Sequence, residues 1–272
     1  MNIPKHIPVI SRFASVTTLS LILLSGSAWA AGTDAVDFNS GALEDSFSNN
    51  VLFGGSPYSL APVGLNKTPG VKLDETLARE GTLVYKKKSY DLSKLSSLEV
   101  SCVFKRRAIG AASHALVLGL TSTSKGHLSG VEGAAFAGLR LQVVDGSLRM
   151  QFQSKAADVS SPNFSSPGLE LKTIEGNWYQ LKVTFSRVDA TNVRVTGVLS
   201  NVTDTGAIGT VAGYFGPNNF SLPGFHVGEI ADSHEVWVAL RANGAGGAEA
   251  LDDLQIVANS GPAASETAAA KP

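Results

Sequence analysis

Hydrophobic and polar residues alternate with a period of two along much of the chain, and helical periodicity of useful length is almost absent. The first clear stretch is 98–105. Its apolar positions are Leu98, Val100, Cys102 and Phe104, and its polar positions include Glu99, Ser101 and Lys105. Such alternation is typical of a β-strand with one dry face and one face in water.

The same alternation recurs in later segments. They are 139–143, 148–153, 179–186, 193–196, 234–241 and 251–257. Asp145 and Gly146 separate the first two and are typical of a hairpin turn. Gly- and Pro-rich loops are expected at 160–168 and 213–224. Many one-sided strands with few helices must pack through their apolar faces, so we predict an all-β fold, a two-sheet antiparallel β-sandwich.

The N-terminal segment has the features of a secretory signal peptide. Lys5 and Arg12 precede an apolar stretch at 16–24, and Ala28 and Ala30 match the A-x-A cleavage pattern. An uncleaved membrane anchor is the alternative, but the apolar stretch is shorter than the roughly 20 residues that span a bilayer. We therefore predict a protein that is secreted or periplasmic.

The remaining chain divides into a domain and a tail. Residues 1–30 form the predicted signal peptide, 31–259 the β-sandwich domain, and 260–272 a C-terminal tail. The tail consists of small and polar residues without periodicity, which is typical of disorder. No segment after the signal peptide is apolar and long enough to span a membrane.

Charge and cysteine content exclude some classes. The chain has 22 basic and 23 acidic residues, a balance that does not indicate a nucleic-acid partner. Cys102 is the only cysteine, so no intramolecular disulfide can form. Because Cys102 alternates with apolar residues, we expect a buried, unreactive thiol.

Three segments carry a resemblance to a known superfamily. They are Val36-Asp37-Phe38 ahead of Phe47, the sequence GNWYQLKV at 176–183, and LDDLQI at 251–256. Together they resemble the concanavalin A-like lectins and glucanases, a superfamily of laminin-G-like jelly rolls. The resemblance covers most of 36–257 and implies a jelly roll whose closing strand lies beside the first strand. It informs the fold rather than the substrate.

Long polar side chains gather on the predicted wet face of the central strands. They are Arg140, Gln142, Arg149, Gln151 and Gln153, with Arg194 as a further candidate. Trp237 is out of phase with its apolar neighbours Val236 and Val238, so its ring is a candidate for stacking on a sugar. This composition suits hydroxyl-rich or anionic sugars. The alternative is an ordinary solvated outer face, with Trp237 in a packing role.

A structural calcium ion is a second hypothesis. In similar jelly rolls a terminal Asp often helps to hold calcium, and here Asp252 and Asp253, with Asp37, would be the ligands. Calcium takes six to eight oxygen ligands, and the sequence offers three side chains. The alternative is that an Asp hydrogen-bonds the end of its own strand.

The sequence argues only weakly for catalysis. The glucanases of this superfamily place three carboxylates on one strand, and no E-x-D-x-E or E-x-D-x-x-E motif is present. A lyase needs a base such as His or Tyr beside Arg or Gln. The candidates His114, His127, His226 and His234 are not joined to the arginines by any recognised spacing.

These patterns favour a secreted, non-catalytic binding module for glycans or another extracellular polymer. A structural or adhesive surface protein is one alternative, and a polysaccharide lyase or other carbohydrate-active enzyme is another. The oligomeric state is left open by the sequence.

Overall fold

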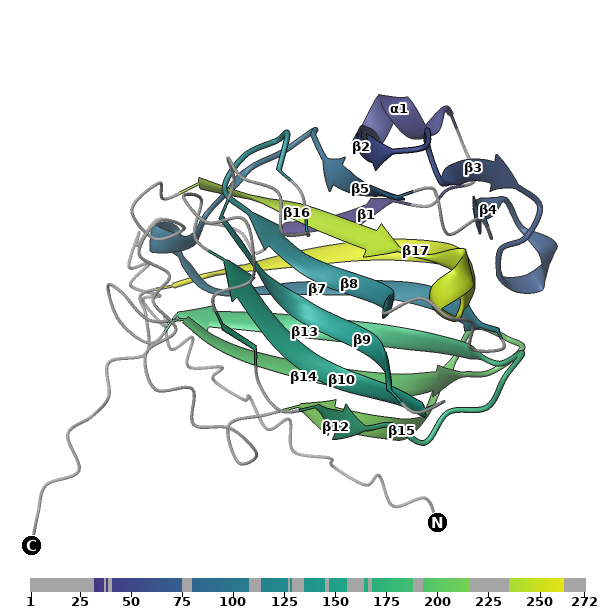
Figure 1. The fold of residues 1–272 in the computed structure, drawn as a ribbon. Helices are drawn as coiled ribbons and strands as arrows, with labels where there is room; N and C mark the ends of the chain where they lie inside the picture. The colour runs from purple at the N-terminus through teal and green to yellow at the C-terminus, as the bar shows by residue number, and fades with distance from the viewer. Residues whose placement is uncertain are drawn as a thin grey trace, which may run out of the picture.

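The structure is a computed structural model. It describes residues 32–36, 38, 41–74, 80–107, 114–126, 128, 135–144, 147–155, 164–165, 168–187, 193–215 and 235–261. Over these residues the chain forms two antiparallel β-sheets packed face to face (Figure 1). The predicted two-sheet sandwich is confirmed. Within the described part of the chain, no helix has the length and apolar character needed to cross a membrane.

The first sheet, sheet A, has eight strands. Seven follow in the spatial order β15 (Ile208–Phe215), β14 (Val193–Val202), β13 (Trp178–Arg187), β7 (Leu95–Arg106), β17 (Ala248–Ser260), β4 (Gly70–Leu73) and β3 (Tyr58–Ala61). The eighth, β1 (Gly32–Val36), pairs with β17. The closing strand therefore lies beside the first strand, as the resemblance implied.

The second sheet, sheet B, has nine strands. Seven follow in the order β11 (Phe164–Ser165), β10 (Ser147–Lys155), β9 (Phe136–Val144), β8 (His114–Thr121), β16 (Glu235–Ala242), β5 (Glu80–Tyr85) and β2 (Phe47–Phe53). At the margins, β12 (Leu169–Glu170) pairs with β10 and β6 (Tyr90–Asp91) pairs with β16. The short helical turns are α1 (Leu43–Ser46), η1 (Leu65–Lys67), η2 (Leu92–Lys94) and η3 (Gly244–Gly246).

The core lies between the sheets and is built from the apolar half of each alternating strand. Its fully buried members include Leu98, Val100 and Phe104 from sheet A and Leu118, Leu139 and Phe152 from sheet B. Burial of each such side chain stabilises the fold by about 1.5–3 kcal/mol. Cys102 lies in this core, where burial and the nearby carboxylates of Asp252 and Asp253 raise the pKa of its thiol. The expectation that this thiol is buried is confirmed, and its lack of reactivity stays a prediction.

Strand positions differ from the sequence-based expectation in several places, among them β11, which lies inside the predicted loop at 160–168. The alternation did not reveal β8, because Ala115–Leu120 are buried on both faces. The predicted loop at 213–224 begins inside β15, which ends at Phe215. β17 runs to Ser260, which pairs with Leu95, so this residue belongs to the sheet rather than to the tail.

Candidate functional site

Four of the predicted site residues share one surface, the outer face of sheet B, which points away from the core. Residues directly opposite each other on paired strands share a face. Arg140 on β9 lies opposite Gln151 on β10, and Gln142 lies opposite Arg149. All four are partly exposed, while their strand neighbours Leu139, Leu141, Leu148 and Met150 are buried in the core.

Trp237 lies on the same face, two strands further along the sheet. It pairs with Thr121 on β8, and Thr121 pairs with Phe136 on β9. The indole is partly buried and packs against a small apolar cluster on this face. The cluster consists of Val84, Val117, Leu128, Phe136 and Ala239. Part of the Trp237 ring therefore packs on the sheet, and part of the residue is exposed at the surface.

Sequence reasoning missed two further cations on this face. Arg241 lies opposite Val117 on β16, and Lys155 lies opposite Phe136 on β10. Both continue the alternation of residues already singled out, because Arg241 is four positions after Trp237 and Lys155 is six after Arg149. The same period of two, extended to the ends of the strands, would have identified them.

Two arginines of this face, Arg140 and Arg241, lie near one another. Arg140 and Arg241 both lie opposite Val117, one on each side of it. Burial, and then the positive charge of Arg241, lower the pKa of Arg140. Like charges at short range on a partly buried surface are costly unless an anion offsets them.

Arg149 packs against the backbone and has no ion-pair partner within the part of the chain that the structure describes. The backbone at Gly168 approaches the side chain so closely that a Cβ there would lie 3.2 Å from the Arg149 Cβ and Cδ. Glu170 is its cross-strand neighbour on β12. Among the described residues, however, no ion pair reaches Arg149, and its buried Nε has no hydrogen-bond acceptor. The packing at Gly168 therefore fixes the aliphatic part of Arg149, which is partly exposed on the outer face of sheet B.

The segment after β8 covers part of the face. The Leu128 amide donates to Thr82 Oγ1 at 3.2 Å, and the Leu128 carbonyl accepts from Arg241 Nη1 at 3.2 Å. The Gly126 carbonyl accepts from Asn50 Nδ2 at 3.0 Å. These contacts close the half of the face over β5 and β16. The half over β9 and β10, with the four predicted residues, stays partly exposed.

Two groups of candidates lie elsewhere. Arg194 is on β14 and points outward from sheet A, so the structure does not bring it to the same face. His114 is in β8, but its side chain lies outside the described part, as do His127, His226 and His234. The hypothesis of a lyase base beside the arginines is therefore untested.

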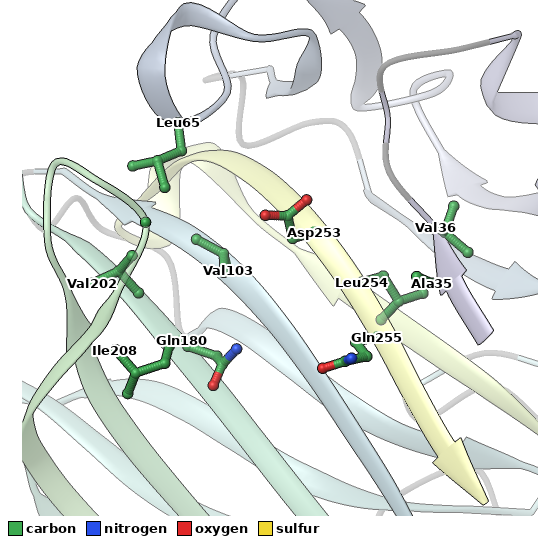
Figure 2. A pocket seen from close by; sticks show the side chains of 11 residues that line it. Ala35, Val36, Leu65, Val103, Gln180, Val202, Ile208, Asp253, Leu254 and Gln255 are labelled. Atoms are coloured by element: carbon green, nitrogen blue, oxygen red, sulfur yellow. The ribbon is translucent and has the colours of Figure 1, made fainter. Parts of the chain in front are cut away.

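A hollow opens on the outer face of sheet A, with a volume of about 240 Å³ (Figure 2). Its walls come from η1, the start of β15, β17 and β1, and its floor comes from β7 and β13. Asp253 lines it, while Asp252 is buried beneath η1. The carboxylates of Asp252 and Asp253 therefore lie in different surroundings.

The predicted calcium site stays a prediction, and the hydrogen bonds of Asp252 are the contacts that bear on it. Asp252 Oδ2 accepts from the Leu65 amide at 2.7 Å, and its Oδ1 accepts from the Asp253 amide at 3.0 Å. Oxygens that accept N–H groups are directed at donors rather than at a cation. No three His, Cys, Asp or Glu of the described residues lie together as metal ligands. The third predicted ligand, Asp37, lies outside the described residues.

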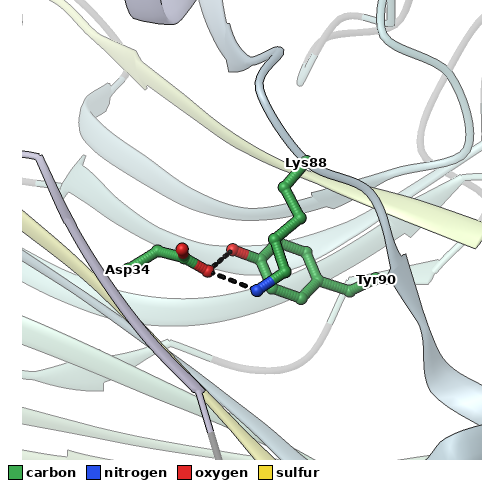
Figure 3. Close-up of polar contacts among 3 residues, drawn as sticks. All are labelled: Asp34, Lys88 and Tyr90. Atoms are coloured by element: carbon green, nitrogen blue, oxygen red, sulfur yellow. Dashed lines mark hydrogen bonds and ion pairs between the residues drawn. The ribbon is translucent and has the colours of Figure 1, made fainter.

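A polar cluster ties the two sheets together at the margin of the sandwich (Figure 3). Asp34 on β1 accepts hydrogen bonds from Tyr90 Oη at 2.8 Å and from Lys88 Nζ at 2.7 Å. Burial acts to raise the pKa of Asp34, but these two hydrogen bonds and the charge of Lys88 outweigh it, so the pKa lies below its ordinary value of 3.8. Tyr90 is 3% exposed and burial raises the pKa of its hydroxyl. This geometry indicates a structural tie.

Asp34→Ala is expected to lower the free energy of unfolding by about 1–3 kcal/mol, because the buried Tyr90 hydroxyl loses its acceptor. The pKa of Asp34 is depressed in the folded state, so its contribution is present above the ordinary pKa and is lost as the pH falls through the folded value. Urea unfolding between about pH 7 and pH 3 measures both effects. If the loss of unfolding free energy in Asp34→Ala is the same at every pH in this range, the ionised carboxylate of Asp34 does not contribute to stability. Exposed Glu175→Ala is the control.

Among known proteins, similarity to this chain is found in solved structures. No protein-family model matches the sequence, and no curated protein sequence matches it. The chain is similar to a protein of unknown function from Shewanella oneidensis MR-1, with 14% identity over 93% of this chain and 97% of that chain and a TM-score of 0.47.

Two further solved structures are carbohydrate-related. A lectin from Bauhinia forficata in complex with GalNAc has 10% identity over 85% of this chain and 99% of that chain, with a TM-score of 0.48. An alginate lyase has 9% identity over 85% of this chain and 98% of that chain, with a TM-score of 0.44. At such identities and TM-scores, the likeness does not bear on what this chain binds, and the residues of the two outer faces must carry the functional interpretation.

Proposed function

We propose that this chain is a non-catalytic binding module for acidic polysaccharides, and that the outer face of sheet B over β9 and β10 is its binding surface. The observation that carries the proposal is Arg149. Its aliphatic stem packs at Gly168, the residue is partly exposed, and it has no ion-pair partner among the described residues. A carboxylate or sulfate group of a sugar would supply the missing acceptor.

The neighbours of Arg149 support an anionic rather than a neutral ligand. Arg140 and Arg241 lie close enough for the charge of one to lower the pKa of the other. A bound anion would be attracted by these positive charges and would accept charge-assisted hydrogen bonds from Arg149. A neutral sugar would lack this attraction.

The arrangement of donors suits a polymer. The pairs Gln142/Arg149 and Arg140/Gln151 occupy successive rows of the same face, about 7 Å apart along the strands. Each row combines an arginine with an amide that both donates and accepts hydrogen bonds. Such repeated rows can contact successive units of a chain bearing hydroxyl and acidic groups.

The test is retention of the chain from Ala31 onward on acidic and neutral polysaccharides, with each bound sample checked for product release by mass spectrometry. The wild-type chain is expected to be retained by the acidic polymer, and less so as salt is raised. Arg149→Gln is expected to weaken binding roughly tenfold or more, because charge-assisted hydrogen bonds are lost.

Arg194→Gln is the matched control, since it removes the same charge from the exposed outer face of sheet A. Equal weakening by both variants would indicate a general charge effect and contradict the assigned surface. Retention on neutral polymers alone would contradict the acidic ligand. Release of shortened products would show that the chain cleaves the polymer, and it would contradict the proposal of a non-catalytic module.

A further inference from the structure

The hollow on the outer face of sheet A is a second candidate binding site, on the opposite side of the sandwich from the arginines. Its apolar side is formed by Leu65, Val202 and Ile208 (Figure 2). Its polar side is formed by Asp253, Gln180 and Gln255. Ile208 is 53% exposed, a large apolar surface left in contact with solvent at the wall of the hollow.

A β-bulge brings Asp253 to this hollow. In the pairing of β17 with β7, Asp252 lies opposite Val103 and Leu254 lies opposite Cys102, so Asp253 is the extra residue. Its φ of +42° is in the left-handed region, which Asp tolerates better than most residues. Bulges of this kind re-aim a side chain and are over-represented near functional sites.

The wall opposite Asp253 is fixed by the preceding residue. The buried Asp252 carboxylate accepts from the Leu65 amide at 2.7 Å and holds η1 against the sheet. The Leu65 side chain then packs on Val103 and Val202. Two adjacent carboxylates thus build the site, one positioning an apolar wall and the other supplying charge.

From this combination we infer that the hollow binds an organic cation, an ammonium group carried on a short aliphatic stem. Among the described residues that line it, Asp253 alone is charged. The Asp253 carboxylate can accept N–H groups of an ammonium, and the amides of Gln180 and Gln255 add hydrogen-bonding groups along the polar side. The aliphatic stem would cover Leu65, Val202 and Ile208. A cavity of about 150 Å³ accommodates benzene, so 240 Å³ has room for a short alkylamine.

The inference is independent of the proposed function. It concerns a different sheet and a ligand of opposite charge, and substitution of Arg149 is expected to leave it unaffected. A lysine side chain presents this chemistry, so Nα-acetyl-lysine methylamide serves as a later probe of the natural source.

The experiment titrates the 15N-labelled chain with hexylamine, hexanol and hexanoate, which share one aliphatic stem. Hexylamine is expected to shift the side-chain amide signals of Gln180 and Gln255 at lower concentration than hexanol, and hexanoate is expected to bind least. Asp253→Asn, which keeps the size of the side chain and tolerates the same φ, is expected to weaken hexylamine binding about fivefold and leave hexanol unchanged.

Two more variants complete the design. Gln255→Lys, at an exposed position, places a competing ammonium beside the hollow and is expected to block hexylamine. Glu170→Gln removes a carboxylate from the margin of sheet B and is expected to have no effect. Equal binding of all three probes, an unaltered Asp253→Asn variant, or the absence of shifts at Gln180 and Gln255 would overturn the inference.

Discussion

Gly119→Ala is expected to lower the free energy of unfolding by about 3 kcal/mol or more. Gly119 on β8 lies directly opposite Gly138 on β9. A Cβ at Gly119 would lie 2.2 Å from the Ala137 carbonyl oxygen and 2.6 Å from Gly138 Cα. Both are backbone atoms, so no side-chain rotation can relieve the clash. The two central strands of sheet B would have to separate.

Urea unfolding followed by circular dichroism measures the loss, and Gly32→Ala is the matched control. A Cβ at Gly32 meets only the flexible end of Lys88, at 3.7 Å, so this variant is expected to remain within about 0.5 kcal/mol of the wild type. If Gly119→Ala unfolds at the same urea concentration as Gly32→Ala, β8 and β9 do not approach as closely at Gly119 as described.

The glycine pair also sets the geometry of the candidate binding surface. It occupies one row of the outer face, between the row of Phe136 and Thr121 and the row of Arg140 and Val117. This row carries no side chain, whereas Phe136 and Val117 on either side of it belong to the apolar cluster that includes Leu128.

Most of the fold could be predicted because a strand with one buried face shows alternating apolar and polar residues in its sequence. Strands such as β7 and β13 face the core with one set of residues and water or a thin cover with the other, so their alternation is visible. β8 is covered on both faces and reads as a continuous apolar run. β15 is an edge strand with Ile208 and Val211 exposed, and its pattern has no dry face to reveal it.

The candidate surface could be predicted only within one hairpin. Arg140 and Arg149 lie on paired strands joined by Asp145 and Gly146, so alternation and a turn place them on one face. Trp237 joins them only because β8 lies between β9 and β16. That strand order depends on contacts distant in sequence, which local periodicity does not contain.

The adjacent carboxylates of β17, Asp252 and Asp253, show most directly what the sequence does not predict. Neighbouring residues of a regular strand point to opposite faces, and neither this rule nor the resemblance predicts a bulge. The extra residue at Asp253 turns one carboxylate into the hollow and leaves the other beneath η1. The separate roles of Asp252 and Asp253 follow from that single register shift.

Asp252→Ala is expected to lower the free energy of unfolding by about 2–3 kcal/mol, because it leaves buried donors without an acceptor. The carboxylate is 2% exposed and accepts from the amides of Leu65 and Asp253 and from Thr68 Oγ1. Asp252→Asn keeps one acceptor oxygen and is expected to lose less. Thermal or urea unfolding of both variants, with and without a chelator, measures the effect. A loss in Asp252→Ala that appears only when calcium is present would mean that the carboxylate acts as a metal ligand, whereas an equal loss in both media assigns its role to holding η1 on the sheet.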